Sequence, residues 1–583
     1  MKFDAPGERA TGSRLASESA LALLASMVFL LALAPAQPFA KELGVCESGA
    51  VRDVLAGSVI LPHYSPGNIV QAPPMFWWAA ALAVRLFGWN EFALRAPSIL
   101  AVALTAATLY AWLASSIGRR CAVWSMLPLL AAQYSADAAR QPRMDALLML
   151  FLTVAIVSLE RALSPSVSDS SVPPRERRAS GVVHRWMLMG CAALAMAAAV
   201  LTKGPIGIIL PGLTLVIFFA IRRRLAAVFR LDLVLTFAAA VGFAAIWYLA
   251  ALDVGGREFF EIQIARGLFG RFLGAAVGMV ADCHHPFYYF IPGLVSGFFP
   301  WSLFYPALAI LLWRHRPDTP APITFALCWF IAVLGFFTIS SGKCLVYILP
   351  LFPALAAMTG WLIATSTSRL PDSDPARRWF DRASIAIGAG VLAIVAVLAA
   401  LVFSGLGDTL APYLHHSDRQ FWKMFSAASR AASPYVIVWA ALWLLGGVIA
   451  LNSARRRDAL RQSVAVAIVA ASGTLFWYGF LNPALASEQT LKPFAAVIDR
   501  TLPAGVPLAY IGKPDCDLAF YSGHTVGSVR NFQCDEPSQA AYFILWQDHL
   551  KDLSASQSGC LVPIGQSAPV DSHGARILMI EKK

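Results

Sequence analysis

Long uncharged apolar runs recur along the whole chain, and they constrain its fold more than any other feature of the sequence. A run of about 18 or more apolar residues is long enough to cross a bilayer as a helix. Only 14% of the 583 residues are charged, whereas a soluble globular chain has about 25%. The sequence therefore predicts a polytopic α-helical membrane protein with about 13 transmembrane helices. The predicted spans are 19–36, 95–117, 121–138, 146–163, 185–202, 205–221, 230–252, 287–313, 323–341, 344–366, 381–405, 432–453 and 461–483.

Arginine clusters between the apolar runs predict the orientation of the chain. The segment 75–92 is apolar, but it contains an arginine, an asparagine and a glutamate. If it crosses the membrane, the clusters at 119–120, 222–224 and 455–457 lie outside; if it lies in the interface, all three lie inside, as basic loops usually do. We therefore expect an interfacial helix there. The net charge of +12 then reflects cytoplasmic loops, and nucleic acid is excluded as a partner.

This orientation divides the chain into a membrane domain, residues 1–485, and a small extracytoplasmic domain, residues 486–583. The membrane domain has two large outside loops, at 37–94 and 253–286. We expect its first apolar run to be retained as a transmembrane span. If this run were instead cleaved as a signal peptide, the loop that follows it would still lie outside. The last residues contain short apolar segments separated by polar turns, which is typical of a small α/β fold.

Three cysteines of the C-terminal domain would lie in an oxidising compartment. We expect one pair to form a disulfide, with Cys516 and Cys534 as the first candidates. The abundance of alanine and arginine indicates a bacterial source, and we expect the inner membrane as the location.

Two carboxylates lie on the outside in this topology. Glu47 follows the first span in an amphipathic segment, a position that suits a general base acting on a lipid-bound substrate. Asp145, preceded by Arg143, stands immediately before a span. Both also have a structural explanation, because an acid near a helix N-terminus is stabilised by the helix dipole. Two acids on one membrane face can share the roles of base, cation ligand and acceptor-orienting group.

Cations lie on the same side of the membrane. Lys203 ends one apolar run before the helix-breaking pair Gly204-Pro205, and Lys343 stands at a second span junction with Tyr347 one turn further on. Arg271 lies in the loop 253–286. A lysine at a helix end often only extends to the interface, but three cations near one interface can bind a lipid phosphate or pyrophosphate and stabilise it as it leaves.

His284 and His285 precede the aromatic segment PFYYF. Three interpretations are open for this pair: metal ligation, hydrogen bonding to a donor substrate, and an interfacial aromatic belt, of which the belt is favoured. No cluster of ligand residues identifies a metal site or a site for another cofactor, and the sequence leaves open whether a divalent cation binds.

Six segments, taken in order, resemble the bacterial glycosyltransferases of the GT-C fold in the superfamily of the protein O-mannosyltransferases and the aminoarabinose (lipid A) transferases. They extend over most of the first 370 residues. The segments are the acidic first loop ending in APPMFWW, then GWNEFALRAPS, ARQPRMDALLMLFLT, LTKGPIGIILP, GRFLG with HHPFYYFIPGLVSGFFPWS, and FFTISSGKCLVYILPLFP.

The resemblance implies transfer of a hexose or pentose from a polyprenyl-phosphate carrier to an envelope acceptor, with inversion, on the periplasmic face of the inner membrane. The acceptor would be a lipid A-like lipid, a glycan or a protein. Glu47 and Asp145 match the acidic positions of the first two outside loops. The residues that match the carrier-phosphate region are Lys203, Arg271, Lys343 and Tyr347; Arg143, His284 and His285 are accessory candidates.

The chain also departs from the pattern of this family. Cys46 stands where the family usually has the aspartate of an Asp-Glu pair, and Gln71-Ala72 precedes the paired prolines where a lysine is common. Gly267 and Leu268 replace a usual His or Asn. These changes fit a different donor and acceptor, or a divergent member with weak activity. A transporter or flippase of polyprenyl-linked lipids, and a non-catalytic scaffold, are the alternatives from other functional classes.

Overall fold

A computed structural model describes most of the chain. The described residues are 12–33, 36–40, 42–65, 68–69, 72–164, 174–263, 285–368, 370–414, 416–431, 433–503, 506–511, 515–524, 526–529, 532, 542–547, 560–567 and 577–582.

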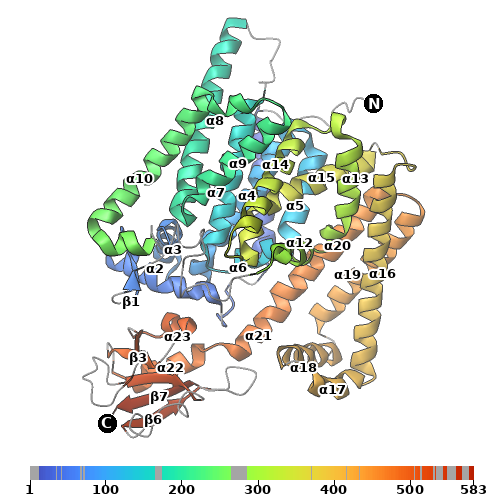
Figure 1. Cartoon of the computed structure of the whole chain (residues 1–583). Helices are drawn as coiled ribbons and strands as arrows, with labels where there is room; N and C mark the ends of the chain where they lie inside the picture. The colour runs from blue at the N-terminus through green and yellow to red at the C-terminus, as the bar shows by residue number, and fades with distance from the viewer. Residues whose placement is uncertain are drawn as a thin grey trace.

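Within these residues, ten helices are long and apolar enough to cross a membrane, so the chain is a multi-pass membrane protein. Figure 1 shows most of them packed side by side as a bundle. These spans are carried by α1 (Gly12–Leu31), α4 (Glu91–Ser116), α7 (Met144–Leu163), α8 (Pro174–Lys203), α10 (Leu231–Phe259), α14 (Ala321–Ile339), α15 (Phe352–Ser368), α16 (Pro375–Phe403), α19 (Pro434–Arg455) and α20 (Ala459–Phe476).

The other predicted spans coincide with helices that are bent or short. The run 287–313 is a bent pair, α12 (Phe290–Gly297) and α13 (Tyr305–Arg314), with an angle of 109° at the break. The run 121–138 is divided between α5 (Arg119–Ala131) and α6 (Gln133–Arg140), and 205–221 is the 16-residue α9 (Ile206–Ile221). The structure therefore gives ten spans, or eleven with the bent pair, among the described residues.

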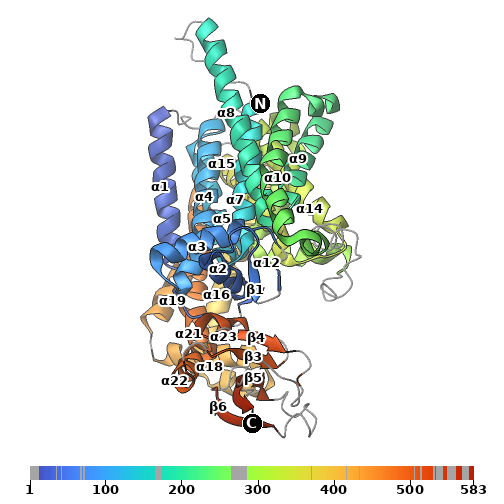
Figure 2. The ribbon, with the colours of Figure 1, turned by 90° about the vertical axis from the view of Figure 1, so that its left-hand side faces the viewer.

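The segment predicted to lie in the interface forms α3 (Met75–Phe87), a helix of 13 residues. At a rise of 1.5 Å per residue it is about 20 Å long, which is shorter than the roughly 30 Å hydrocarbon core. It packs on α2 (Glu47–Ala56) and on α4, at the end of the bundle (Figure 2). Leu82, Leu86 and Phe87 are exposed on its surface, as expected for a helix that lies on lipid.

The remaining helices and a hairpin lie around the bundle. Their bounds are α17 (Leu406–Leu410), α18 (His416–Arg430) and α21 (Asn482–Gln489), with the hairpin β1 (His63–Ser65) and β2 (Asn68–Ile69) and the 3₁₀ segments η1 (Leu43–Cys46) and η8 (Leu345–Leu351).

The last part of the chain forms a small α/β unit. Its five-stranded sheet has the order β4-β3-β5-β7-β6, in which β3 is parallel to β4 and β5, and β7 is antiparallel to β5 and β6. A buried apolar cluster joins one face of the sheet to the two helices. The elements are α22 (Lys492–Thr501), β3 (Leu508–Ile511), α23 (Cys516–Tyr521), β4 (Val526–Val529), β5 (Tyr542–Trp546), β6 (Leu561–Gln566) and β7 (Ile577–Lys582).

The unit lies against the end of the bundle that carries α2, α3 and β1, away from the chain N-terminus (Figures 1 and 2). A disulfide joins Cys516, the first residue of α23, to Cys46, the last residue of η1, across 470 positions of sequence. The predicted pairing of Cys516 with Cys534 is therefore wrong, because α23 packs on η1 of the first loop and brings the two Cα atoms to 4.8 Å. Cys560 is also disulfide-bonded.

A buried ion pair anchors the first loop to the bundle. Arg95 of α4 is fully buried; its guanidinium contacts a carboxylate oxygen of Glu42 at 2.7 Å and donates to the carbonyl of Gln37 at 2.6 Å. Its Cζ also lies 4.3 Å from the centroid of the Phe39 ring. Burial raises the pKa of Glu42, and the charge and hydrogen bonds of Arg95 oppose this change.

Replacing Arg95 should therefore loosen the loop. Arg95→Met leaves Glu42 buried without its partner, a change that typically costs about 3–5 kcal/mol, and we expect the thermal unfolding temperature in detergent to fall by several degrees. The double variant with Glu42→Gln should lose less. Arg85→Met, at an exposed site on α3, is the matched control and should melt as the wild type does; equal melting of all variants would contradict the anchoring role.

Candidate active site

Four elements bring the predicted site residues to one end of the bundle. Asp145 lies in the first turn of α7, and Lys203 is the last residue of α8. Tyr347 lies in η8, and Glu47 is the first residue of α2. Because α7 and α8 pack as neighbours along the bundle, the start of the one meets the end of the other (Figure 1). This is the end at which the α/β unit lies.

Asp145 is the centre of the charged groups. Its side chain is buried, with 3% of the residue exposed. One carboxylate oxygen forms an ion pair with Nζ of Lys203, and the other lies 3.3 Å from Nε of Arg143. Its position in the first helical turn also gives it the favourable interaction with the helix dipole. A buried carboxylate with two cationic partners stays charged and fixes both cations in place.

The end of helix α8 directly after Lys203 lets the lysine side chain turn toward the site. Gly204 has φ +79°, a left-handed conformation that ends α8 before Pro205. The Lys203 ammonium lies 4.7 Å from the centroid of the Tyr347 ring, a cation–π distance. The ion pair and the ring together hold this lysine at the site rather than in the lipid interface.

Lys343 is buried, with 7% of the residue exposed, whereas the Lys203 side chain is 18% exposed. The Lys343 ammonium donates to the carbonyl oxygen of Ser340 at 2.8 Å. Among the described residues, no carboxylate lies at ion-pair distance from it. Burial of an unpaired ammonium is unfavourable, and this arrangement suits a site that receives an anion.

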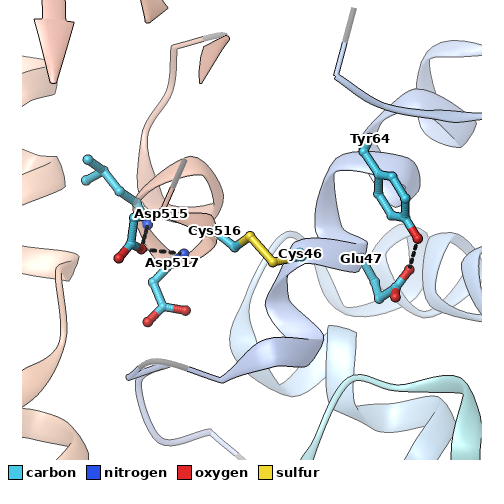
Figure 3. The surroundings of a disulfide bond; sticks show 7 residues. Cys46, Glu47, Tyr64, Asp515, Cys516 and Asp517 are labelled. Atoms are coloured by element: carbon cyan, nitrogen blue, oxygen red, sulfur yellow. Dashed lines mark hydrogen bonds between the residues drawn. A yellow bond between two sulfur atoms is a disulfide. The ribbon is translucent and has the colours of Figure 1, made fainter. Parts of the chain in front are cut away.

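Glu47 lies among aromatic hydrogen-bond donors. The indole N–H of Trp77 donates to its Oε2 at 2.7 Å. The hydroxyl of Tyr64 lies 3.4 Å from the same oxygen, as Figure 3 shows. Burial raises the pKa of Glu47, although the Trp77 hydrogen bond and the charge of Arg143 oppose the shift; the charge of Asp145 adds to it. A carboxyl group with a raised pKa is well matched to accept a proton near neutral pH.

The structure places the other candidates as follows. Arg143 belongs to the Asp145 group. His285 stacks on Tyr289, with the ring centroids 3.9 Å apart. Arg271 and His284 lie outside the described residues. Within the described part of the chain, no group of three His, Cys, Asp or Glu side chains could hold a metal ion.

Two functional contacts were missed by sequence reasoning. Trp77 belongs to the APPMFWW motif, but only the fold brings its N–H to Glu47. Tyr64 lies on β1 and reaches Glu47 because Gly49 lets β1 approach α2 closely: a Cβ at Gly49 would collide with the backbone carbonyl of Tyr64. A glycine within the amphipathic segment was the available signal in the sequence.

Parts of the sequence, and the overall fold, are similar to those of known proteins. Residues 71–248 match the family described as dolichyl-phosphate-mannose-protein mannosyltransferase. The overall fold is similar to the crystal structure of ArnT from Cupriavidus metallidurans bound to undecaprenyl phosphate, with a TM-score of 0.72, 20% identity, and coverage of 97% of this chain and 98% of the other. The family match covers only part of the chain, and the likeness to the ArnT structure shows a shared fold.

Two curated proteins with similar sequences are named undecaprenyl phosphate-alpha-4-amino-4-deoxy-L-arabinose arabinosyl transferase. The protein of Erwinia tasmaniensis is 27% identical over 363 residues, which cover 60% of this chain and 59% of the relative. The protein of Pectobacterium atrosepticum is 29% identical over 317 residues, which cover 52% of each chain. The chain thus spans between half and three fifths of the length of these relatives.

The approach of β1 to α2 gives a test of the site geometry. Gly49→Ala should push Tyr64 and its strand away from α2, at a cost of about 1–3 kcal/mol for overpacking. We expect a fall of several degrees in thermal unfolding temperature. Gly190→Ala, at a helical site with nothing within 4 Å of the added Cβ, is the matched control. If Gly49→Ala melts as Gly190→Ala does, the close approach is not part of the folded site.

Proposed function

We propose that this chain is a glycosyltransferase that moves a sugar from a polyprenyl-phosphate carrier to an envelope acceptor with inversion. The proposed acceptor is a lipid A-like lipid, a glycan or a protein. The observation that carries the proposal is the placement of a partly buried carboxyl group, Glu47, close to the charges of Arg143 and Asp145 at one end of a GT-C bundle, where Asp145 also pairs with Lys203. The names of the relatives, which act with undecaprenyl phosphate, support this donor class.

In the proposed reaction, Glu47 is the general base. The acceptor hydroxyl oxygen attacks the anomeric carbon from the face opposite the phosphate, and its proton passes to Glu47. The bond from the anomeric carbon to the phosphate oxygen breaks, and polyprenyl phosphate leaves with the electron pair. One displacement inverts the configuration at the anomeric carbon. The raised pKa of Glu47 supports this role.

The cations are proposed to bind the leaving phosphate. Lys343 has a buried ammonium without a carboxylate partner among the described residues, and Lys203 is fixed by Asp145 and the Tyr347 ring. Cations already fixed in a low-dielectric site stabilise developing negative charge without reorganisation. Asp145 is proposed to act through Lys203 and Arg143, since both of its oxygens face cations. Arg271 is the further cation that the family pattern adds.

The proposed topology has about 13 spans, with residues 1–485 as the membrane domain and 486–583 as a periplasmic domain. The arginine clusters support it, because the positive-inside rule puts them in the cytoplasm of a bacterial inner membrane. The active site then faces the periplasm, where no nucleotide sugar is needed.

Lipid analysis by mass spectrometry tests this function in vivo. A deletion strain is complemented with the wild type, Asp145→Asn or Glu47→Gln. We expect a glycosylated envelope species to disappear on deletion and to return only with the wild type, with each variant at least about 100-fold less active, as for loss of a base or of a charge-fixing group. If no glycan mass changes while a polyprenyl-linked lipid accumulates, a transporter of such lipids becomes the better account.

The pH dependence of transfer tests the role of Glu47. Because the base must be deprotonated and burial raises its pKa, kcat/KM should fall at a pH above the ordinary value for glutamate as the solution is acidified. Trp77→Phe removes a hydrogen bond that stabilises the charged form, so the pKa rises and the acid limb should move up by about one pH unit.

Trp78→Phe is the matched control for this shift. The indole N–H of Trp78 donates to the carbonyl of Val59 rather than to a carboxylate, so its loss should leave the acid limb unchanged. An acid limb that is the same in both variants, or that moves to lower pH in Trp77→Phe, would contradict the assignment of Glu47 as base.

A further inference from the structure

The candidate base is adjacent to a covalent link with the distant α/β unit. Cys46 directly precedes Glu47, and its disulfide partner is Cys516 at the start of α23 (Figure 3). The first residue of α2 is therefore one peptide bond from a crosslink to residues 470 positions away. Any displacement of α23 is transmitted to the N-terminus of α2 through this bond.

A polar contact fixes α23 relative to the membrane bundle. The Tyr521 hydroxyl accepts a hydrogen bond from the backbone N–H of Phe39 at 2.7 Å and donates to Glu91 at 3.1 Å. Lys492 of α22 forms an ion pair of 2.8 Å with the same carboxylate. Glu91 begins α4 and is buried, with 7% of its surface exposed, whereas the Lys492 side chain stays 55% exposed.

Aromatic packing completes the contact. Phe520 is buried; its ring stacks on Trp89 with centroids 5.1 Å apart and meets the Phe39 ring edge-on at 4.9 Å. The indole N–H of Trp89 donates to the carbonyl of Phe520 at 3.1 Å. The Arg52 guanidinium lies 4.8 Å from the Trp89 ring centroid and donates from Nη2 to the same carbonyl of Phe520 at 3.4 Å. Because Arg52 belongs to α2, the helix that carries Glu47 is held to the unit at a second point.

The helix α2 needs such support. It has ten residues, and no side chain caps its N-terminus; a helix this short is not stable alone in water. Its C-terminus ends at Gly57 in the left-handed conformation, and it packs on α3 and β1 as well as on α23. The direction of the Glu47 side chain therefore depends on contacts outside the helix.

We infer that Cys46 and Cys516 are positioning residues for the base, so that the α/β unit sets the place of Glu47 through their disulfide. This inference rests on the proposed function of Glu47. The α/β unit then holds the base in its position through the disulfide. Cleavage of the disulfide therefore lowers the rate of the chemical step more than it weakens donor binding.

The test uses the purified full-length protein in detergent with a polyprenyl-phosphate sugar, before and after treatment with dithiothreitol. Thiol–disulfide exchange gives two cysteine thiols and the cyclic disulfide of the reagent. We expect kcat to fall about 10-fold or more, as for a displacement of the order of 1 Å, while KM for the donor changes less than about two-fold. Cys516→Ser should show the same fall and no further response to the reductant.

Two controls separate this effect from other consequences of reduction. Cys191→Ser removes a free, exposed cysteine of α8 and should behave as the wild type with and without reductant. Cys516→Ser also tests the disulfide of Cys560, because this variant keeps that bond while it lacks the bond to Cys46. If reductant still lowers kcat in Cys516→Ser, the effect comes from another disulfide and the inference is overturned. Wild-type kcat in Cys516→Ser, or a KM that rises in proportion to the loss of kcat, would overturn it as well.

Hydrogen–deuterium exchange of residues 47–56 gives a readout that does not need catalysis. Reduction and Cys516→Ser should both increase exchange in α2, and unchanged exchange would contradict the positioning role. If the wild type transfers no sugar while exchange in α2 still increases on reduction, the proposed function fails and the structural link stands.

Discussion

The buried carboxylate of Asp145 is the interaction on which the arrangement of the site depends. A charge at 3% exposure must be matched, and here two cations from different segments match it: Lys203 at the end of α8 and Arg143 directly before α7. This requirement fixes the register of α7 against α8 and holds Lys203 under the Tyr347 ring. Lys343 then stands out as the cation that the described residues leave without a carboxylate, which is why the phosphate is assigned to this side of the site.

The parts of the site that could be predicted are those whose position follows from one segment of sequence. Lys203 precedes Gly204-Pro205, so the break in the helix marks the lysine as the end of a span, and the structure has it there. Asp145 and Lys343 lie at similar junctions. The interfacial interpretation of 75–92 rested on charge balance across many loops, and the 13-residue α3 agrees with it.

The parts that could not be predicted depend on contacts between distant segments. Cys516 was assigned to a partner within its own domain because sequence gives no measure of distance between domains, whereas η1 and α23 bring Cys46 next to it. The donors of Glu47, Trp77 and Tyr64, come from α3 and β1 and meet only when the first loop is folded. Hydropathy also could not distinguish a straight span from the bend of 109° between α12 and α13, since both present the same apolar length.

The central claim is that Lys343 and Lys203 bind a polyprenyl phosphate, and binding of undecaprenyl phosphate to the purified protein tests it most directly. Native mass spectrometry would compare the wild type with Lys343→Met, Lys343→Arg and, as the control, Lys423→Met at an exposed site on α18. The account predicts that Lys343→Met loses affinity by about 10-fold or more, as for removal of a buried charge partner, that Lys343→Arg retains part of it, and that Lys423→Met binds as the wild type does. Equal binding by Lys343→Met and the wild type would contradict the account.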